Sequence, residues 1–125
     1  MARTAFIAHR GGAAEGYENT LSAFRRAVRA GAGMLELDVH LTRDKEVVVA
    51  HDQNLLRTAG RDADIRDLAY AELPRMRDTV TVDFCPGESF CDTTTVMEER
   101  RLPRLEEVLT QFPDTQLNID VKADL

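Results

Sequence analysis

Cysteine is scarce in this sequence, and its spacing excludes the usual roles of cysteine pairs. Cys85 and Cys91 are the only cysteines among 125 residues. They are too far apart for a CxxC redox motif, and no second pair suggests a zinc site. We therefore expect two reduced thiols in a loop, as is usual in proteins inside cells.

Long apolar runs and an excess of positive charge are also missing. No stretch approaches about 18 apolar residues, the length of a transmembrane helix. The net charge is −6, from 16 basic and 22 acidic residues, so we expect no nucleic-acid partner, which would need a basic face. A small anionic substrate is compatible with this charge, because local charge at a site can oppose the net charge. No signal peptide is recognisable, so the chain as written is expected to be cytoplasmic.

The sequence does contain an alternation of strand-like and helix-like patterns. A continuous apolar run at 5–8 is typical of a buried parallel strand. Further strands are predicted at 34–39, 47–50 and 117–122, helices at about 20–30 and 102–112, and short helical turns between 55 and 74. The least regular segment, 75–101, is expected to be an inserted loop or small hairpin. This order predicts one α/β domain over 1–125, with parallel strands and crossover helices.

Polar side chains suited to catalysis stand at the ends of these strands. In a parallel sheet the carboxyl ends of the strands meet at one rim, where functional groups gather. Alternation within 34–39 puts both of its acidic side chains on the same face. The side chains expected at this rim are His9, Arg10, Glu36, Asp38, Asp120 and Lys122.

A β-hairpin is expected to bring a second histidine to this rim. The polar residues 42–46 predict a turn centred on Asp44 and Lys45. A register symmetric about that turn places Asp38 opposite His51. The prediction is therefore that His51 lies beside the acidic pair.

The remaining polar residues near these motifs are interpreted as structural or are left open. His40 is expected to point away from the carboxylates of its strand and to have a structural role. Glu18 and Asn19 are expected to shape the loop and cap the helix that follows. Asp52 either orients His51 or caps the next turn, and the sequence leaves both readings open.

These residue types suit the chemistry of a phosphodiester. Such an ester is an anion that repels a nucleophile, and carboxylates bind the hard cations, Mg²⁺ or Ca²⁺, that neutralise this charge. An arginine can fork onto phosphate oxygens, and two histidines can take and give protons. The attacking group can be water or a neighbouring substrate hydroxyl, and the sequence leaves both open.

Several motifs in this order resemble the glycerophosphodiester phosphodiesterase family. The doubled glycine after HR, the segment ELPRM at 72–76 and the stretch at 101–122 look most like the animal subgroup with lysophospholipase D activity. The residues that carry the resemblance are HRG at 9–11, ENT at 18–20, ELDV at 36–39, HD at 51–52, LPRLEEVL at 102–109 and LNIDVK at 117–122.

The resemblance implies a fold and a set of roles. The fold is a TIM-like (β/α)8 barrel of the phosphatidylinositol phosphodiesterase-like type, of which this chain holds about the first three barrel strands plus a β-hairpin. The family usually has glutamate at the position of Asp120, although the lipid-cleaving subgroup tolerates aspartate. By motif, the general acid/base pair is His9 and His51, the phosphate ligands are Arg10 and Lys122, and the ligands of Mg²⁺ or Ca²⁺ are Glu36, Asp38 and Asp120.

The resemblance implies hydrolysis of a small glycerophosphodiester or a lysophospholipid, with release of an alcohol head group. No specific protein partner is predicted. A parent protein could associate with the endoplasmic reticulum membrane through a segment absent here. Two alternatives stay open: a truncated, catalytically incompetent fragment or partner-dependent interaction module, and a phospholipase like sphingomyelinase D.

Overall fold

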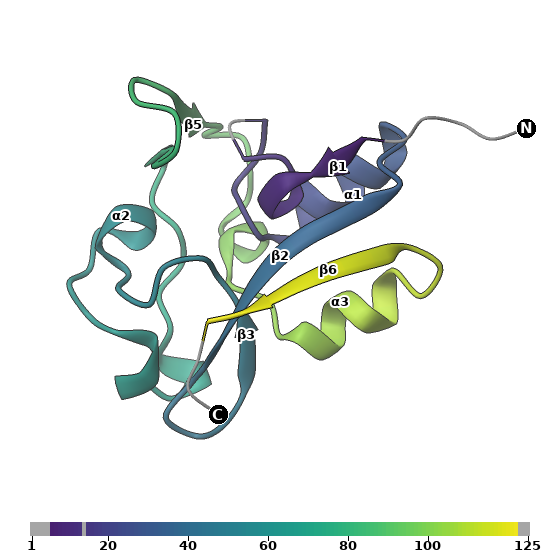
Figure 1. Ribbon diagram of the computed structural model, residues 1–125. Coiled ribbons are helices and arrows are strands. Elements are labelled where there is room, and N and C mark those ends of the chain that lie inside the picture. The colour runs from purple at the N-terminus through teal and green to yellow at the C-terminus, as the bar shows by residue number, and fades with distance from the viewer. Residues whose placement is uncertain (1–5, 14, 123–125) are drawn as a thin grey trace, which may run out of the picture.

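A four-stranded sheet forms the centre of the molecule (Figure 1). The computed structural model describes residues 6–13 and 15–122. Strand β2 (Met34–Leu41) is central and pairs with the other three. The short β1 (Ile7–Ala8) and the longer β6 (Gln116–Val121) run parallel to β2, whereas β3 (Val47–Val49) runs antiparallel to it.

The register shows how these strands share the two edges of β2. Leu35 pairs with residues of both β1 and β6, and Val39 pairs with residues of both β3 and β6. Strands β1 and β3 therefore follow one another along one edge of β2, and β6 takes the other edge. The three expected parallel strands and the hairpin are confirmed as part of a partial α/β fold.

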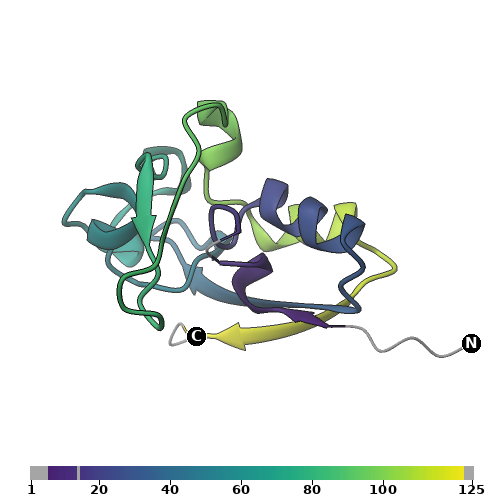
Figure 2. The same cartoon turned by 90° about the horizontal axis from the view of Figure 1, so that it is seen from above.

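One face of the sheet is covered by two helices. Helices α1 (Leu21–Arg29) and α3 (Leu105–Gln111) lie side by side on it (Figure 2). Leu35 and Leu37 of β2 are fully buried there, together with Phe24 of α1 and Val108 of α3. Because side chains alternate along a strand, the acidic residues of β2 lie on the face that carries no helix.

The first helix begins and ends where the sequence predicts. The hydroxyl oxygen of Thr20 accepts a hydrogen bond from the N–H of Ala23 (3.2 Å), which caps the helix. Gly31 follows the last turn with a φ of 99°. The second long helix begins three residues later than predicted, because residues 102–104 are extended: the carbonyl oxygen of Pro103 accepts from the N–H of Val49 in β3 (2.9 Å).

Between the hairpin and α3 the chain forms several short elements around a second apolar cluster. Within 75–101, strands β4 (Thr79–Thr81) and β5 (Ser89–Cys91) pair as a small antiparallel hairpin, which is one of the two forms expected for this segment. Both cysteines are free and exposed; Cys85 lies in the loop between the two strands, as expected, whereas Cys91 is the last residue of β5. The other elements are α2 (Leu56–Ala59) and the 3₁₀ turns η2 (Ile65–Asp67), η3 (Tyr70–Glu72) and η4 (Met97–Arg100).

The hairpin of β2 and β3 has a register one residue away from the expected one. Val39 lies opposite Val49, and the N–H of Ala50 donates to the carbonyl oxygen of Asp38 (2.9 Å). Asp38 is therefore opposite Ala50, and the predicted pairing of Asp38 with His51 is wrong.

The shape of the turn explains this shift. The N–H of Lys45 donates to the carbonyl oxygen of Thr42 (3.0 Å), and Lys45 itself has a left-handed backbone with a φ of 69°. A tight turn whose last residue is left-handed is typical of three-residue hairpin loops. Such a loop is centred on Asp44 alone, so every pair is displaced by one residue.

His40 also lies elsewhere than expected. It is two residues after Asp38 on a regular strand, so both side chains lie on the same face, and the expectation that His40 points away is wrong. His40 is only 4% exposed, and its Nε2 lies 2.9 Å from the carbonyl oxygen of His51. The ring thus supports the backbone of His51.

No helix in the described part of the chain combines the length and apolarity that crossing a membrane requires.

Candidate active site

A sharp turn after β1 aims the side chains of the HRG motif in different directions. His9, Arg10 and Gly11 form the short turn η1, with a left-handed φ of 52° at Arg10. This conformation is uncommon outside glycine. It is held by the carbonyl oxygen of Arg10, which accepts from the N–H of Asn19 (2.8 Å). As a result, the Arg10 side chain is buried (4% exposed), whereas the His9 side chain remains half exposed (51%).

The same turn contacts the acidic strand β2. The N–H of Arg10 donates to Oε2 of Glu36 (3.0 Å), and Nε2 of His9 lies 3.5 Å from the same oxygen. Two residues along, Asp38 is 2% exposed, and its Oδ2 accepts from the side-chain amide of Asn19 (3.3 Å). The structure thus brings His9, Arg10 and Glu36 into direct contact.

Strand β6 adds a third carboxylate to this face. Asp120 lies directly opposite Asp38 in the parallel register, so the two side chains point to the same side of the sheet. Nζ of Lys122 lies 2.9 Å from Oδ2 of Asp120. The hydrogen bond to Asp120, with the nearby carboxylates of Asp38 and Glu36, raises the pKa of the Lys122 ammonium.

His51 is held by its neighbour Asp52. Nδ1 of His51 lies 2.7 Å from Oδ1 of Asp52, and Asp52 in turn accepts from Nε of Arg57 (2.9 Å). Of the two readings that the sequence left open for Asp52, this contact favours orientation of His51. Within the described ranges, no hydrogen bond or ion pair joins His51 to Glu36 or Asp38 directly.

Replacing Asp52 with asparagine is expected to make the free energy of unfolding depend less on pH in the acidic range. Burial alone would raise the pKa of Asp52, but the hydrogen bonds from Arg57 and His51 outweigh it and lower the pKa below the ordinary 3.8. The carboxylate then stabilises the fold above its unfolded pKa, and this contribution is lost as the pH falls through the lower, folded value. Urea unfolding should show a gap between wild type and Asp52→Asn at pH 7 that closes below about pH 4. A gap of constant size across this range would contradict the assignment.

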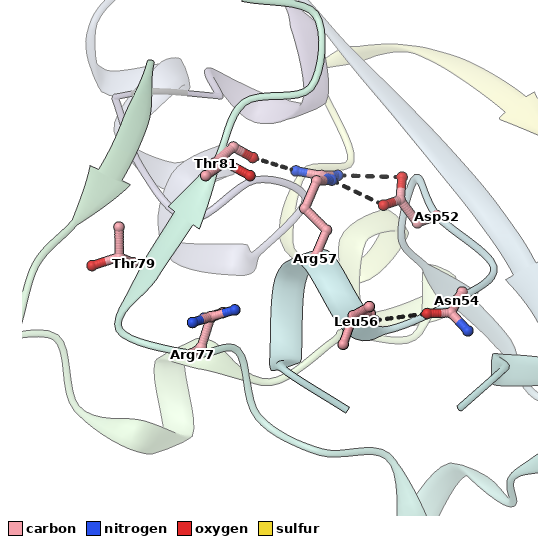
Figure 3. Close-up of a pocket in the computed structure, with 7 residues that line it drawn as sticks. All are labelled: Asp52, Asn54, Leu56, Arg57, Arg77, Thr79 and Thr81. Atoms are coloured by element: carbon pink, nitrogen blue, oxygen red, sulfur yellow. Dashed lines mark hydrogen bonds and ion pairs between the residues drawn. The ribbon is translucent and has the colours of Figure 1, made fainter. Parts of the chain in front are cut away.

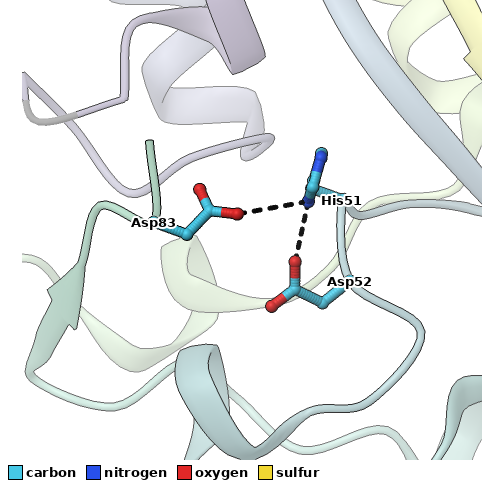
Figure 4. Close-up of side chains that lie close together, drawn as sticks. All are labelled: His51, Asp52 and Asp83. Carbon is cyan, nitrogen blue, oxygen red and sulfur yellow. Dashed lines mark hydrogen bonds and ion pairs between the residues drawn. The ribbon is translucent and has the colours of Figure 1, made fainter. Parts of the chain in front are cut away.

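Asp83 was not predicted, yet it links the two parts of the site. Its Oδ1 accepts from a guanidinium nitrogen of Arg10 (2.5 Å), and its Oδ2 lies 3.8 Å from Nδ1 of His51 (Figure 4). Burial would raise the pKa of Asp83, but the hydrogen bond from Arg10 lowers it. The next residue, Phe84, packs on the ring of His9 with the ring centroids 4.7 Å apart.

Glu18 was interpreted as a residue that shapes its loop, and its contacts go further. Its side chain is 3% exposed and lies between two guanidinium groups. Oε2 of Glu18 is 3.4 Å from Arg10, and both of its oxygens accept from Arg57 (2.7 and 2.8 Å). Arg57 and Asp52 also line a surface pocket, together with Arg77, Thr79 and Thr81 (Figure 3).

Two groups of side chains offer metal ligands. One oxygen each from Asp52 and Asp83 and a ring nitrogen of His51 lie within 4.8 Å of one another. However, both of these carboxylates already have a guanidinium partner. On the open face of the sheet, Glu36, Asp38 and Asp120 have no guanidinium partner within the described ranges, and Lys122 is the cation that pairs there. The oxygens of these three carboxylates share one face but, unlike the ligand atoms of the first group, do not all lie within 4.8 Å of one another. Carboxylate oxygens are the ligands that a hard divalent cation prefers.

Comparisons with known proteins place the chain in a family. The family described as "Glycerophosphoryl diester phosphodiesterase family" matches residues 9–125. Human lysophospholipase D GDPD1 is 45% identical over 123 residues, which cover 94% of this chain and 36% of that protein. The glycerophosphodiester phosphodiesterase of Caldanaerobacter subterraneus is 34% identical over 125 residues, covering 98% of this chain and 47% of that protein.

Solved structures give the same result. The glycerophosphodiester phosphodiesterase of Thermotoga maritima has a TM-score of 0.71 at 33% identity, over 98% of this chain and 46% of that chain. An Oleispira antarctica phosphodiesterase, solved with the product sn-glycerol-3-phosphate, has a TM-score of 0.69 at 28% identity, over 97% of this chain and 45% of that chain. The present chain therefore spans less than half the length of these relatives, and 36% of the human one. Its motifs, its partial α/β fold and these matches agree, and the chain belongs to the glycerophosphoryl diester phosphodiesterase family.

Proposed function

We propose that this chain supplies catalytic groups for metal-dependent hydrolysis of a glycerophosphodiester or lysophospholipid, of the lysophospholipase D type. The observation that carries the proposal is the contact of Glu36 with both His9 and the backbone of Arg10. It joins a metal-binding type of side chain to a proton-transfer group and a phosphate-binding group. Phosphodiester hydrolysis needs these three functions together.

The proposed metal ligands are Glu36, Asp38 and Asp120, on the open face of the sheet. When bound there, Mg²⁺ or Ca²⁺ would neutralise charge on a nonbridging phosphate oxygen. Arg10 and Lys122 would bind the remaining anionic oxygens. The guanidinium of Arg10 can do so with two parallel N–H groups, whereas the ammonium of Lys122 acts as a point charge.

The two histidines are proposed to move the protons. One takes a proton from the attacking hydroxyl or water, and the other gives one to the leaving alkoxide oxygen. The contact of Nδ1 of His51 with a carboxylate favours a proton on that nitrogen, so Nε2 is the ring atom available for transfer. His9 lies beside Glu36 with half of its side chain exposed, which leaves its ring accessible to a substrate.

The test uses a chimera in which this chain replaces the matching segment of human GDPD1. Choline release from lysophosphatidylcholine and glycerophosphocholine should require Mg²⁺ or Ca²⁺ and stop with a chelator. Glu36→Gln should lower the rate by about 100-fold or more, because a neutral amide is a poor ligand for a hard cation. Glu106→Gln, on the exposed side of α3, is the matched control and should keep the wild-type rate.

Two results would contradict the proposal. One is a folded chimera, checked by circular dichroism, that releases no choline with either metal. The other is a Glu36→Gln chimera with undiminished metal-dependent activity. The same assay on the 125-residue chain alone shows whether these groups suffice without the rest of a relative.

A further inference from the structure

Arg57 is the most heavily engaged charged side chain near His51. It lies on the short helix α2 and is 15% exposed. Its Nε donates to Oδ2 of Asp52 (2.9 Å), and its two terminal nitrogens donate to the two oxygens of Glu18 (2.7 and 2.8 Å). The carbonyl oxygen of Thr81 accepts a further bond (2.6 Å; Figure 3). These bonds use both edges of the planar guanidinium, which leaves it little freedom to rotate.

The position of Arg57 determines the orientation of Asp52. Arg57 donates to both carboxylate oxygens, to Oδ2 through Nε (2.9 Å) and to Oδ1 through a terminal nitrogen (3.3 Å), and the carboxylate held in this way places Oδ1 2.7 Å from Nδ1 of His51 (Figure 4). Burial would lower the pKa of Arg57, but the bonds to Glu18 and Asp52 raise it above its usual range. The Asp52 carboxylate is therefore held by the cation of Arg57 in a position in which its Oδ1 also faces Nδ1 of His51.

The contact with Asp52 selects one form of the imidazole. A carboxylate that accepts from Nδ1 favours the tautomer with its proton on Nδ1, and this leaves the lone pair on Nε2. Within the described ranges, Nε2 of His51 makes no hydrogen bond to the protein. A ring held in this way presents its basic nitrogen away from Asp52.

Glu18 connects this chain of contacts to Arg10. It is buried, and its carboxylate lies between the guanidinium groups of Arg57 and Arg10. A buried carboxylate requires such partners, because an unpaired charge in this position would be strongly destabilising. The same carboxylate thus fixes the group proposed to bind phosphate and, through Arg57 and Asp52, the ring proposed to transfer a proton.

We infer that Arg57 is a positioning residue: held by Glu18, it orients Asp52 so that His51 keeps its proton on Nδ1 and offers Nε2 to the substrate. The link to catalysis rests on the proposed function. The positioning itself is a property of the free chain, and it can be measured without metal, substrate or turnover.

Long-range ¹H–¹⁵N spectra of the imidazole rings measure the tautomer of His51 in the 125-residue chain. In the wild type the neutral ring should be mainly the Nδ1–H form. In Arg57→Met the fraction of this form should fall by about twofold or more, toward the mixture found in a free histidine. Asp52→Ala removes the hydrogen-bond acceptor of Nδ1, so its spectrum shows the largest change in the His51 tautomer fraction that loss of this contact can cause.

Two further variants separate positioning from general structural damage. Arg43→Met is the matched control, because Arg43 is 58% exposed and pairs with Glu72 on the surface; its His51 spectrum should be that of the wild type. Arg57→Lys keeps the charge but cannot fork onto both carboxylates, so an intermediate tautomer fraction is expected. If Arg57→Met does not fold, the tautomer fraction of His51 in Arg57→Lys is the measurement that tests the inference.

The inference is overturned if Arg57→Met, or the lysine variant in its place, keeps the wild-type tautomer while Asp52→Ala changes it. It is overturned equally if Asp52→Ala leaves the spectrum unchanged. A chimera without hydrolytic activity would refute the proposed function but would leave this result standing.

Discussion

Replacing His51 with alanine is expected to lower the rate of choline release by the chimera by about 10²–10⁴-fold, the usual contribution of a general acid or base. The ring is oriented by Asp52 at 2.7 Å, so Nε2 is the atom that would exchange a proton with the substrate. Measurement at saturating substrate should show the loss in kcat, with a smaller change in KM, because a proton-transfer group acts mainly in the transition state.

Added imidazole provides a control for this substitution. It should partly restore the rate of the His51→Ala chimera, because the cavity left by the ring lies at the surface of the site, where the side chain is 26% exposed. Added imidazole should leave the Glu36→Gln chimera inactive, since that variant lacks a metal ligand. A His51→Ala chimera that keeps more than about a tenth of the wild-type rate would rule out this role.

Replacing Gly11 with alanine is expected to destabilise the chain by about 2–5 kcal/mol, which combines left-handed strain with overpacking. Gly11 has a φ of 72°, and an added Cβ would lie 2.6 Å from Cδ1 of Phe24. Phe24 is fully buried in the main core, so its ring has no free space into which to move. Urea unfolding of the 125-residue chain measures the loss.

Gly12→Ala is the matched control for this prediction. Gly12 also has a left-handed backbone, with a φ of 94°, but an added Cβ would meet nothing within 4 Å. It should therefore show the strain alone, about 1–2 kcal/mol. Equal losses in the two variants would mean that the contact between Gly11 and Phe24 does not limit this position.

The parts of the fold that could be predicted are those with a regular period. The alternation of 34–39 placed Glu36 and Asp38 on one face, and the helical spacing of 20–30 identified α1. Both patterns are local, because each is set by the geometry of a single element. The rim formed by His9, Arg10 and Glu36 followed from the parallel arrangement of β1 and β2.

The parts that could not be predicted depend on single backbone angles or on distant contacts. The left-handed Lys45 shifts the hairpin by one residue, and a lysine gives no sequence signal for that conformation. Asp83 binds Arg10, although the two residues are 73 positions apart in the sequence. The segment around Asp83 contains no recognisable motif and no regular hydrophobic period, so the contact could not be predicted. Arg57 lies five residues after Asp52 of the HD motif. The sequence signal that could have indicated its role is that the two acidic residues it contacts, Glu18 and Asp52, each need a cation as partner.

A phosphate that binds Arg10 must displace the carboxylate of Asp83, which already pairs with this guanidinium. Since Arg10 already has an internal counterion, an incoming anion competes with a tethered one whose local concentration is high. Any affinity measured at Arg10 is therefore a difference between two ionic contacts. A doubly charged phosphate would gain more from that exchange than a singly charged diester, so we expect a phosphomonoester to bind at Arg10 more tightly than a diester.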